Sequence, residues 1–352
     1  SALAQKGADL GSAIANDVLG VMYQAGTNFK PDFSKAASYF KVAADKGYLR
    51  ADARLCYLAA DAEPVPFTAS YDEIVRYCTL AATSGDALGE ATLGYLYENG
   101  GYGLQVDLTR AEYLYKEAAD QNFVTAQVLL GALQYRGPKA QQDPAGAFAL
   151  FQKAAARGYP AGLRWLAIAY ELGIGTPVDI PHAGQLYDQA GAANDVVAAF
   201  LLGYKVADGT PATAIVDNEL NRFGDAPTDP VGLRILGQLF ERGFNRTMDV
   251  AQAVATYQRC AGTNALCQFI LGSYFKYRAP TADLVAAARL YQQGAAAGEM
   301  HSQFELGYMY ETGEGEPKDL QKAAALYTAA AQQGNGVARD RLAHLNSGSA
   351  SP

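Results

Sequence analysis

The stretch HSQFELGYMYETGEGEPKDLQKAAALYTAAAQQG, residues 301–334, predicts two short helices joined by a glycine turn. The first helix carries Gly307 and Tyr310 on one face, because residues three positions apart are neighbours on a helix. The second helix opens at Asp319, a residue type that caps helix N-termini, and stops at Gly334. The rest of the chain consists of faithful or eroded copies of this unit.

Small residues in the place of Gly307 mark nine copies of the unit, which we number in chain order. We call these small residues anchors. They are Gly20, Cys56, Gly94, Gly131, Ala167, Gly203, Gly237, Gly272 and Gly307. Their nearly constant spacing predicts an all-α solenoid of nine antiparallel helix pairs, in which each unit buries its face against its neighbours. A tenth first helix, Ala338 to Leu345, has no partner helix and is expected to cap the end.

The remaining repeated positions have physical reasons. We expect a small anchor because two helices cross there, so that Gly94→Leu should overpack the crossing. Six residues after the anchor, glycine should end the first helix with a positive φ, at Gly26, Gly100, Gly137, Gly173, Gly209, Gly243 and Gly313.

Aspartates then recur as expected N-caps of the second helix, rather than as metal ligands: Asp32, Asp107, Asp143, Asp179, Asp249, Asp283 and Asp319. The second helices are expected to end on residues that tolerate positive φ: Gly47, Gly85, Asn122, Gly158, Asn194, Asn264, Gly298 and Gly334.

Two copies depart from the pattern, at residues 56–85 and 203–230. In the first, Ala62 to Ser70 replaces the glycine turn and Ser70 takes the capping place. In the second, residues 208–230 lack the aspartate cap, the aromatic residue and the alanine pair, which suggests either a hinge or neutral decay of one repeat. We otherwise expect one solenoid over residues 1–345 and a disordered tail at 346–352.

The pattern A-x-x-x-L-G-x-x-Y, a glycine turn and D-x-x-x-A-x-x-x-Y-x-x-A-A resembles the Sel-one-like repeat (SLR) family, relatives of the tetratricopeptide repeat. The resemblance runs from about Ala13 to Leu345. It implies a right-handed α/α superhelix with a concave surface for protein partners, in many cases a bacterial envelope adaptor. Such proteins include exopolysaccharide-secretion scaffolds, periplasmic regulators and immunity proteins. A periplasmic or secreted location with a removed signal peptide is therefore expected.

Four cysteines are present, and an even count is weak support for an oxidising compartment. Cys260 and Cys267 flank the junction between two helix pairs, where the cysteine-rich branch of the family carries disulfides, so the resemblance implies a bond between them. Cys56 and Cys78 replace an anchor and the aromatic residue that faces it. A disulfide and two reduced core thiols both fit that pair.

By analogy with tetratricopeptide repeats, side chains three before, one after and four after each anchor should line a partner-binding groove. The set is aromatic with charges of both signs: Tyr57, Tyr95, Glu98, Tyr135, Arg164, Glu171, Phe200, Tyr204, Arg234, Glu241, Phe269, Lys276, Phe304, Tyr308 and Glu311. A helix or extended peptide could lie there. We expect about half of the aromatic rings to pack between repeats instead.

Composition and motifs disfavour several other classes of function. Net charge is −8 with no basic run, which disfavours nucleic acid as a partner, and no apolar run is long enough for a transmembrane segment. The three histidines, His182, His301 and His344, lie far apart and form no known metal motif, so no metal or cofactor is expected. The alternative to a non-enzymatic scaffold is a penicillin-binding or β-lactamase-like enzyme, because Ser38 and Lys41 match S-x-x-K.

Overall fold

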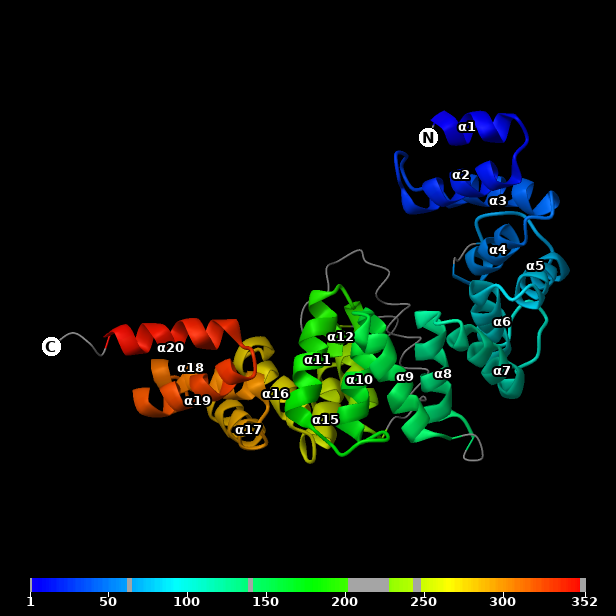
Figure 1. The fold of residues 1–352 in the computed structure, drawn as a ribbon. Helices are drawn as coiled ribbons and strands as arrows, with labels where there is room; N and C mark the ends of the chain where they lie inside the picture. Colours follow the sequence, from blue (N-terminus) through cyan, green and yellow to red (C-terminus); the bar gives the residue numbers. More distant parts are fainter. Residues whose placement is uncertain (1, 62–64, 139–141, 202–227, 243–247, 349–352) are drawn as a thin grey trace. The chain divides into compact units, whose positions relative to one another are not determined.

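The computed structural model describes residues 2–61, 65–138, 142–201, 228–242 and 248–348, which form helices, turns and an isolated bridge between Gly101 and Leu104. The predicted all-α solenoid of helix pairs is confirmed (Figure 1). The chain divides into two compact units, residues 1–142 and 143–352, and each is described by itself.

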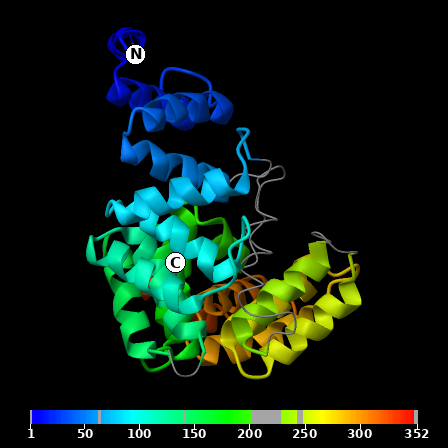
Figure 2. The same cartoon turned by 90° about the vertical axis from the view of Figure 1, so that its right-hand side faces the viewer.

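Unit 1 consists of helices that pair in chain order, with each second helix antiparallel to its first (Figures 1 and 2). They are α1 (Ala2–Asp9), α2 (Ala13–Ala25), α3 (Phe33–Asp45), α4 (Leu49–Asp61), α5 (Tyr71–Thr83), α6 (Ala87–Asn99), α7 (Leu108–Asp120) and α8 (Val124–Arg136). The first helices are α2, α4, α6 and α8. Helix α1 precedes the first repeat and was not predicted, because its eight residues carry no repeat signal.

Unit 2 continues the same arrangement, with a π-helix inserted after α16. Its helices are α9 (Pro144–Ala156), α10 (Pro160–Leu172), α11 (Ile180–Ala192), α12 (Val196–Leu201), α14 (Pro230–Arg242), α15 (Val250–Ala261), α16 (Ala265–Ser273), η2 (Tyr274–Arg278), α17 (Leu284–Ala296), α18 (Met300–Thr312), α19 (Leu320–Gln332) and α20 (Gly336–Gly348). The first helices are α10, α12, α14, α16 with η2, and α18. Helix α20 follows the last pair, where the capping helix was expected.

A glycine-to-ring contact holds five of the helix pairs together. A Cβ atom placed on Gly94 would lie 2.8 Å from a ring carbon of Tyr115, and one on Gly272 would lie 2.8 Å from Tyr291. Both rings are completely buried. The same contact joins Gly20 with Phe40, Gly237 with Tyr257 and Gly307 with Tyr327. The anchor is therefore small because the aromatic ring of its own second helix lies against it.

The turn of each pair is closed by a backbone hydrogen bond and a cap. The N–H of the capping aspartate donates to the carbonyl of the aromatic residue three after the anchor, at 2.8–3.0 Å: Asp32 to Tyr23, Asp107 to Tyr97, Asp179 to Tyr170, Asp249 to Phe240, Asp283 to Phe275 and Asp319 to Tyr310. Each aspartate carboxylate then accepts from the first turn of the second helix, which confirms the predicted caps. Ser70 also caps as predicted, in a reciprocal capping box with Glu73.

Two of the glycine and asparagine predictions are wrong. Gly137 has φ −59° rather than a positive value, because Pro138 follows it and restricts the preceding residue to extended conformations. Asn264 has φ −131° and does not end a second helix; its side chain caps α16 by accepting from the N–H of Cys267. At Gly26, Gly100, Gly173 and Gly313 the expected positive φ is present.

The predicted hinge at 208–230 falls mostly outside the described residues. On either side of it, Glu171 of α10 and Arg234 of α14 form a buried ion pair with side chains 0% exposed. Contacts also skip copies, since Asp188 of α11 reaches His301 of α18. Unit 2 therefore departs from a simple solenoid, in which repeats touch only their immediate neighbours.

We expect Gly94→Leu to lower the free energy of unfolding by roughly 1–3 kcal/mol, because the added side chain has to displace the buried Tyr115 ring. Denaturant unfolding followed by circular dichroism measures the change. The matched control is Gly184→Ala in α11, where an added Cβ meets no atom within 4 Å and helix propensity improves. Equal stability of Gly94→Leu and the parent would contradict the packing argument.

Candidate functional site

The first-helix faces hold the predicted partner-binding residues at two depths. Half-buried are Tyr57, Tyr95, Glu98, Tyr135, Glu241, Phe304, Tyr308 and Glu311, and fully buried are Arg164, Glu171, Arg234, Phe269 and Lys276. The side chain of Phe200 and all of Tyr204 lie outside the described residues. Only the half-buried group remains open to a partner without rearrangement.

The predicted groove acids are already engaged within the protein. Glu98 accepts from the Tyr115 hydroxyl at 2.7 Å and lies 3.7 Å from the Arg136 guanidinium. Glu241 and Glu311 repeat the arrangement, with Tyr257 and Arg278, and with Tyr327 and Arg341 respectively. We call each such group of a glutamate, a tyrosine and an arginine a tie. Each tie joins a first helix to its own second helix and to a later first helix. These charges therefore hold repeats together.

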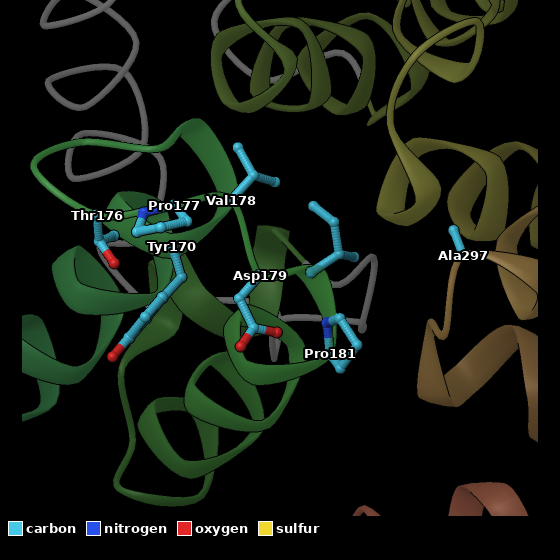
Figure 3. A pocket seen from close by; sticks show the side chains of 8 residues that line it. Tyr170, Thr176, Pro177, Val178, Asp179, Pro181 and Ala297 are labelled. Atoms are coloured by element: carbon cyan, nitrogen blue, oxygen red, sulfur yellow. The ribbon is translucent and has the colours of Figure 1, made fainter.

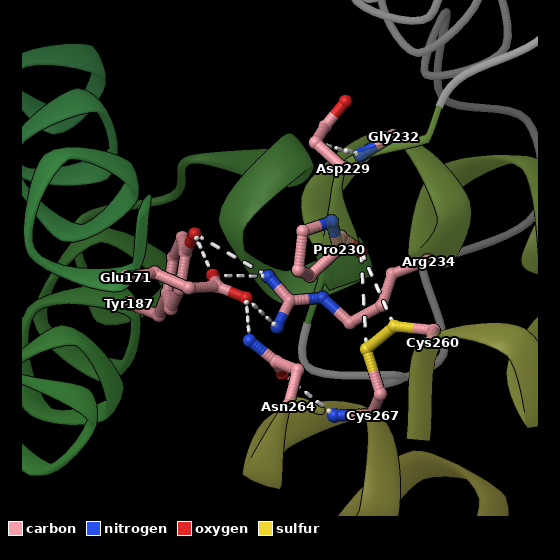
Figure 4. Close-up of polar contacts among 9 residues, drawn as sticks. All are labelled: Glu171, Tyr187, Asp229, Pro230, Gly232, Arg234, Cys260, Asn264 and Cys267. Carbon is pink, nitrogen blue, oxygen red and sulfur yellow. Dashed lines mark hydrogen bonds and ion pairs between the residues drawn. A yellow bond between two sulfur atoms is a disulfide. The ribbon is translucent and has the colours of Figure 1, made fainter. Parts of the chain in front are cut away.

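The most buried tie centres on Glu171 in unit 2 (Figure 4). Its carboxylate accepts two hydrogen bonds from Arg234 at 2.7 and 2.8 Å, one from the Tyr187 hydroxyl at 2.7 Å and one from Asn264 at 2.8 Å. Burial, and next the Glu171 charge, raise the pKa of Tyr187 well above its usual value. Burial alone would lower the pKa of Arg234, but Glu171 and Tyr187 outweigh it and the pKa is raised.

The sequence carries a signal for these ties that the groove prediction missed. At four of the five second-helix tyrosine rings, Tyr115, Tyr187, Tyr257 and Tyr327, the residue four after the anchor is glutamate; at Tyr291 it is a lysine. Where the ring is phenylalanine, at Phe40 and Phe151, that residue is Gln24 or Tyr135. A phenolic O–H is a donor that a buried carboxylate needs, so the two positions belong together.

The eighth copy reverses the charges. Its first helix ends in the π-helix η2 instead of a glycine, and the N–H of Ala279 donates to the carbonyl of Tyr274 five residues back. Lys276, not glutamate, follows the anchor by four and donates to Glu305 at 2.8 Å. The Tyr277 hydroxyl donates to the same carboxylate at 2.6 Å.

Aromatic rings on these faces are held in place by their neighbours. Tyr308 lies between two cations, with the Lys276 ammonium 4.7 Å and the Arg341 guanidinium 4.6 Å from its ring centre. In unit 1, Tyr95 packs on the edge of the hydrophobic core while part of its side chain stays accessible. Rings fixed in this way lose little conformational entropy when a partner binds.

Both cysteine pairs lie at bonding separation. Cys56 and Cys78, with Cα atoms 4.9 Å apart, occupy the anchor and ring places of the second copy, so a disulfide replaces the glycine-to-ring contact there. Cys260 and Cys267 have Cα atoms 5.6 Å apart and bracket Asn264, one of the Glu171 partners.

A surface hollow of about 440 Å³ lies at the turn between α10 and α11 (Figure 3). Its lining residues are Tyr170, Thr176, Pro177, Val178, Asp179, Ile180, Pro181 and Ala297, so one wall comes from the turn before α18. Polar and apolar atoms line it in similar amounts. Asp179 caps α11, and its carboxylate accepts from the N–H of His182 at 3.0 Å.

The residues considered for chemistry are not gathered together. Ser38 is exposed on α3, where its hydroxyl donates to the Lys35 carbonyl at 2.7 Å, as serines commonly do within helices. His182 stacks on Tyr170 in unit 2, while His301 faces two carboxylates. The described ranges contain no group of three or more His, Cys, Asp or Glu side chains placed for a metal ion. Nor do they contain a helix long and apolar enough to cross a membrane.

Comparison with known proteins settles the family. The model described as Sel1 repeat matches residues 13–48, 88–123, 124–159, 160–195, 265–299 and 301–335, which is more than half of the chain. The chain belongs to the Sel1 repeat family. Proteins built from Sel1 repeats are in general protein-interaction scaffolds, and the fold is in general non-catalytic. The irregular copies at 56–85 and 203–230 fall outside the matched segments.

Solved structures with similar folds include two bacterial proteins, and no curated protein matches the chain. One is a protective antigen with an SLR fold, present in uropathogenic Escherichia coli strains; it is 26% identical over 97% of this chain and 73% of its own, with a TM-score of 0.47. Another is a Sel1 repeat protein from Oxalobacter formigenes, 24% identical over 97% of this chain and 89% of its own, with a TM-score of 0.37.

Removing one member of the buried Glu171 tie should strongly destabilise unit 2. Arg234→Leu leaves an uncompensated carboxylate in a site with no solvent exposure, and we expect a loss of roughly 3–5 kcal/mol in the free energy of unfolding. Adding Glu171→Gln to this variant should recover much of the loss. Chemical denaturation measures both, with the half-exposed Arg341→Leu as a milder control. A fully stable Arg234→Leu protein would refute the assigned role of the tie.

We expect protein prepared under oxidising conditions to contain no alkylatable thiol until a reductant is added. Peptide mass spectrometry without reductant should then recover a bridge between Cys260 and Cys267. Two alkylated thiols at these positions would remove the proposed disulfide.

Proposed function

We propose that this Sel1 repeat protein is a non-enzymatic scaffold that binds a partner protein along its first-helix faces. The observation that carries the proposal is the set of half-buried aromatic side chains on successive first helices. In unit 1 they are Tyr57, Tyr95 and Tyr135, on α4, α6 and α8, and in unit 2 Phe304 and Tyr308 on α18. The general role of the family supports the same conclusion.

Tyrosine suits this task because it offers a large contact area with few rotatable bonds and a hydroxyl at its tip. The rings also recur at the spacing of the repeat, which matches a long ligand better than a compact one. A helix or an extended segment of a partner protein meets these requirements, because it can touch several repeats in turn.

The charges of these faces constrain the partner. The carboxylates of Glu98, Glu241 and Glu311 are each paired with an arginine and a tyrosine of this protein. A partner that paired with them would first have to break a tie between repeats. We therefore expect apolar and aromatic contacts to supply most of the binding energy, with hydrogen bonds at the tyrosine hydroxyls.

The cysteines support a location in an oxidising compartment. Four cysteines that lie as two pairs at bonding distance fit an oxidising compartment, so we place the protein in the periplasm or outside the cell. Within that compartment, a scaffold for exopolysaccharide secretion, a regulator of an envelope sensor and an immunity protein all use a rigid protein-binding surface. A pull-down from the native host, read with the neighbouring genes, separates these roles.

Binding should depend on the first-helix tyrosines. We expect Tyr95→Ala and Tyr308→Ala each to weaken partner affinity by about 1–3 kcal/mol, because each removes a pre-positioned contact ring. Calorimetry with the purified partner measures the change. Tyr113→Ala on the second helix α7, where the ring is 62% exposed, is the matched control and should bind normally.

Circular dichroism and thermal unfolding confirm that each variant is folded. Unchanged affinity in both first-helix variants, or equal weakening in the Tyr113 control, would count against this face.

A further inference from the structure

The His301 ring is held between two carboxylates in unit 2. Its Nδ1 lies 2.8 Å from Glu299, the residue that caps α18, and its Nε2 lies 3.2 Å from Asp188 of α11. The ring also packs on Phe269 of α16, with ring centres 5.0 Å apart. The His301 side chain is only 10% exposed, so water competes weakly for both nitrogens.

This contact joins helices that are distant in the sequence. Asp188 and His301 are separated by 113 residues, and the contact passes over the irregular sixth copy. The same junction brings Pro181 of α11 against Gly298. It also forms the hollow of Figure 3, whose walls are the turn before α11 on one side and Ala297 on the other.

The protonation state of the ring decides how many of these bonds exist. A neutral imidazole has one N–H donor, whereas the imidazolium has two. Glu299 is already fixed as an acceptor, because it caps the N–H groups of His301 and Ser302 at 2.9 and 2.6 Å. Burial would raise the pKa of Glu299, but His301 and these hydrogen bonds outweigh it and the pKa is lowered. A carboxylate therefore faces the ring on each side, and only the charged ring donates to both.

We propose that His301 and Asp188 form a proton-dependent tie that fastens α11 to the start of α18. With the ring charged, both carboxylates are bridged and the walls of the hollow are held together. With the ring neutral, its single N–H donates to one carboxylate. The lone pair of the other ring nitrogen then faces the second carboxylate. Glu299 is the more deeply buried and the closer acceptor, so the bond to Asp188 is the one that is lost.

The surroundings of the ring support a response in the range where histidine titrates. Glu299 faces it from the start of α18 and Asp188 from α11, while α16 contributes the uncharged ring of Phe269. Histidine is the side chain whose ordinary pKa puts a change of charge between about pH 5 and 8. This inference concerns the junction within unit 2 and does not depend on the proposed partner face.

A double-mutant cycle tests the tie. Unfolding of the parent, His301→Gln, Asp188→Asn and the double variant is measured at about pH 5 and about pH 8. We expect a coupling of about fivefold or more in the unfolding equilibrium constant at the lower pH, falling to nearly onefold at the higher pH. The Glu241 and Arg278 pair is the matched control, because arginine stays charged throughout and its coupling should not change.

Hydrogen exchange on the unmodified protein gives an independent reading. Amides of α11 and of the turn at 297–299 should exchange faster at about pH 8 than at about pH 5, after correction for intrinsic exchange, whereas those of α15 should not. A coupling that is absent at both pH values, or identical at both, would overturn the proposal. So would equal protection of α11 across the pH range.

Discussion

The contact between the anchor and the buried ring of its own second helix determines how each helix pair is built. Gly94 and Gly307 lack the Cβ atom that would collide with Tyr115 and Tyr327, so the two helices approach closely enough to bury the whole ring. The second copy reaches the same end differently, with Cys56 and Cys78 in these two places. A small residue against a ring and a pair of cysteines thus satisfy one requirement, a short distance between helices at one level of the repeat.

The ties between repeats follow from the same ring. Its hydroxyl lies at the level of the glutamate four residues after the anchor, and an arginine from a later first helix completes the group, as with Glu241, Tyr257 and Arg278. Several polar side chains that we expected to face a partner also join one repeat to another. The partner-binding proposal consequently rests on half-buried aromatic rings, and charge contributes mainly to the integrity of the scaffold.

Much of the fold could be predicted from the sequence because the repeat is local. Anchors, aspartate caps and the Ser70 cap are set by neighbours within one helix pair, and those that fall in the described residues are present. The anchor Gly203 lies outside these residues. The exceptions have equally local causes, such as Pro138 after Gly137. The π-helix at 274–278 was missed because the eighth copy lacks the glycine that ends the first helix elsewhere, and the sequence does not indicate which other ending replaces it.

The partner-binding face was predicted less well than the fold, because the burial of a side chain depends on how the repeats pack together. Helical spacing correctly placed Glu171 and Arg234 on first helices, but only packing shows that both are buried against each other. The contact of Asp188 with His301 depends on how α11 meets α18 after an irregular copy, which no periodicity encodes. Position within a repeat is therefore readable from sequence, whereas contacts between distant repeats are not.

We propose that partner proteins bind to the first-helix faces, and that the second helices serve mainly to support these faces. Hydrogen-exchange mass spectrometry of the protein with and without its purified partner tests this most directly. We expect added protection in α4, α6, α8 and α18, with α5, α7 and α19 unchanged. Protection confined to the second helices, or spread evenly over both, would contradict it.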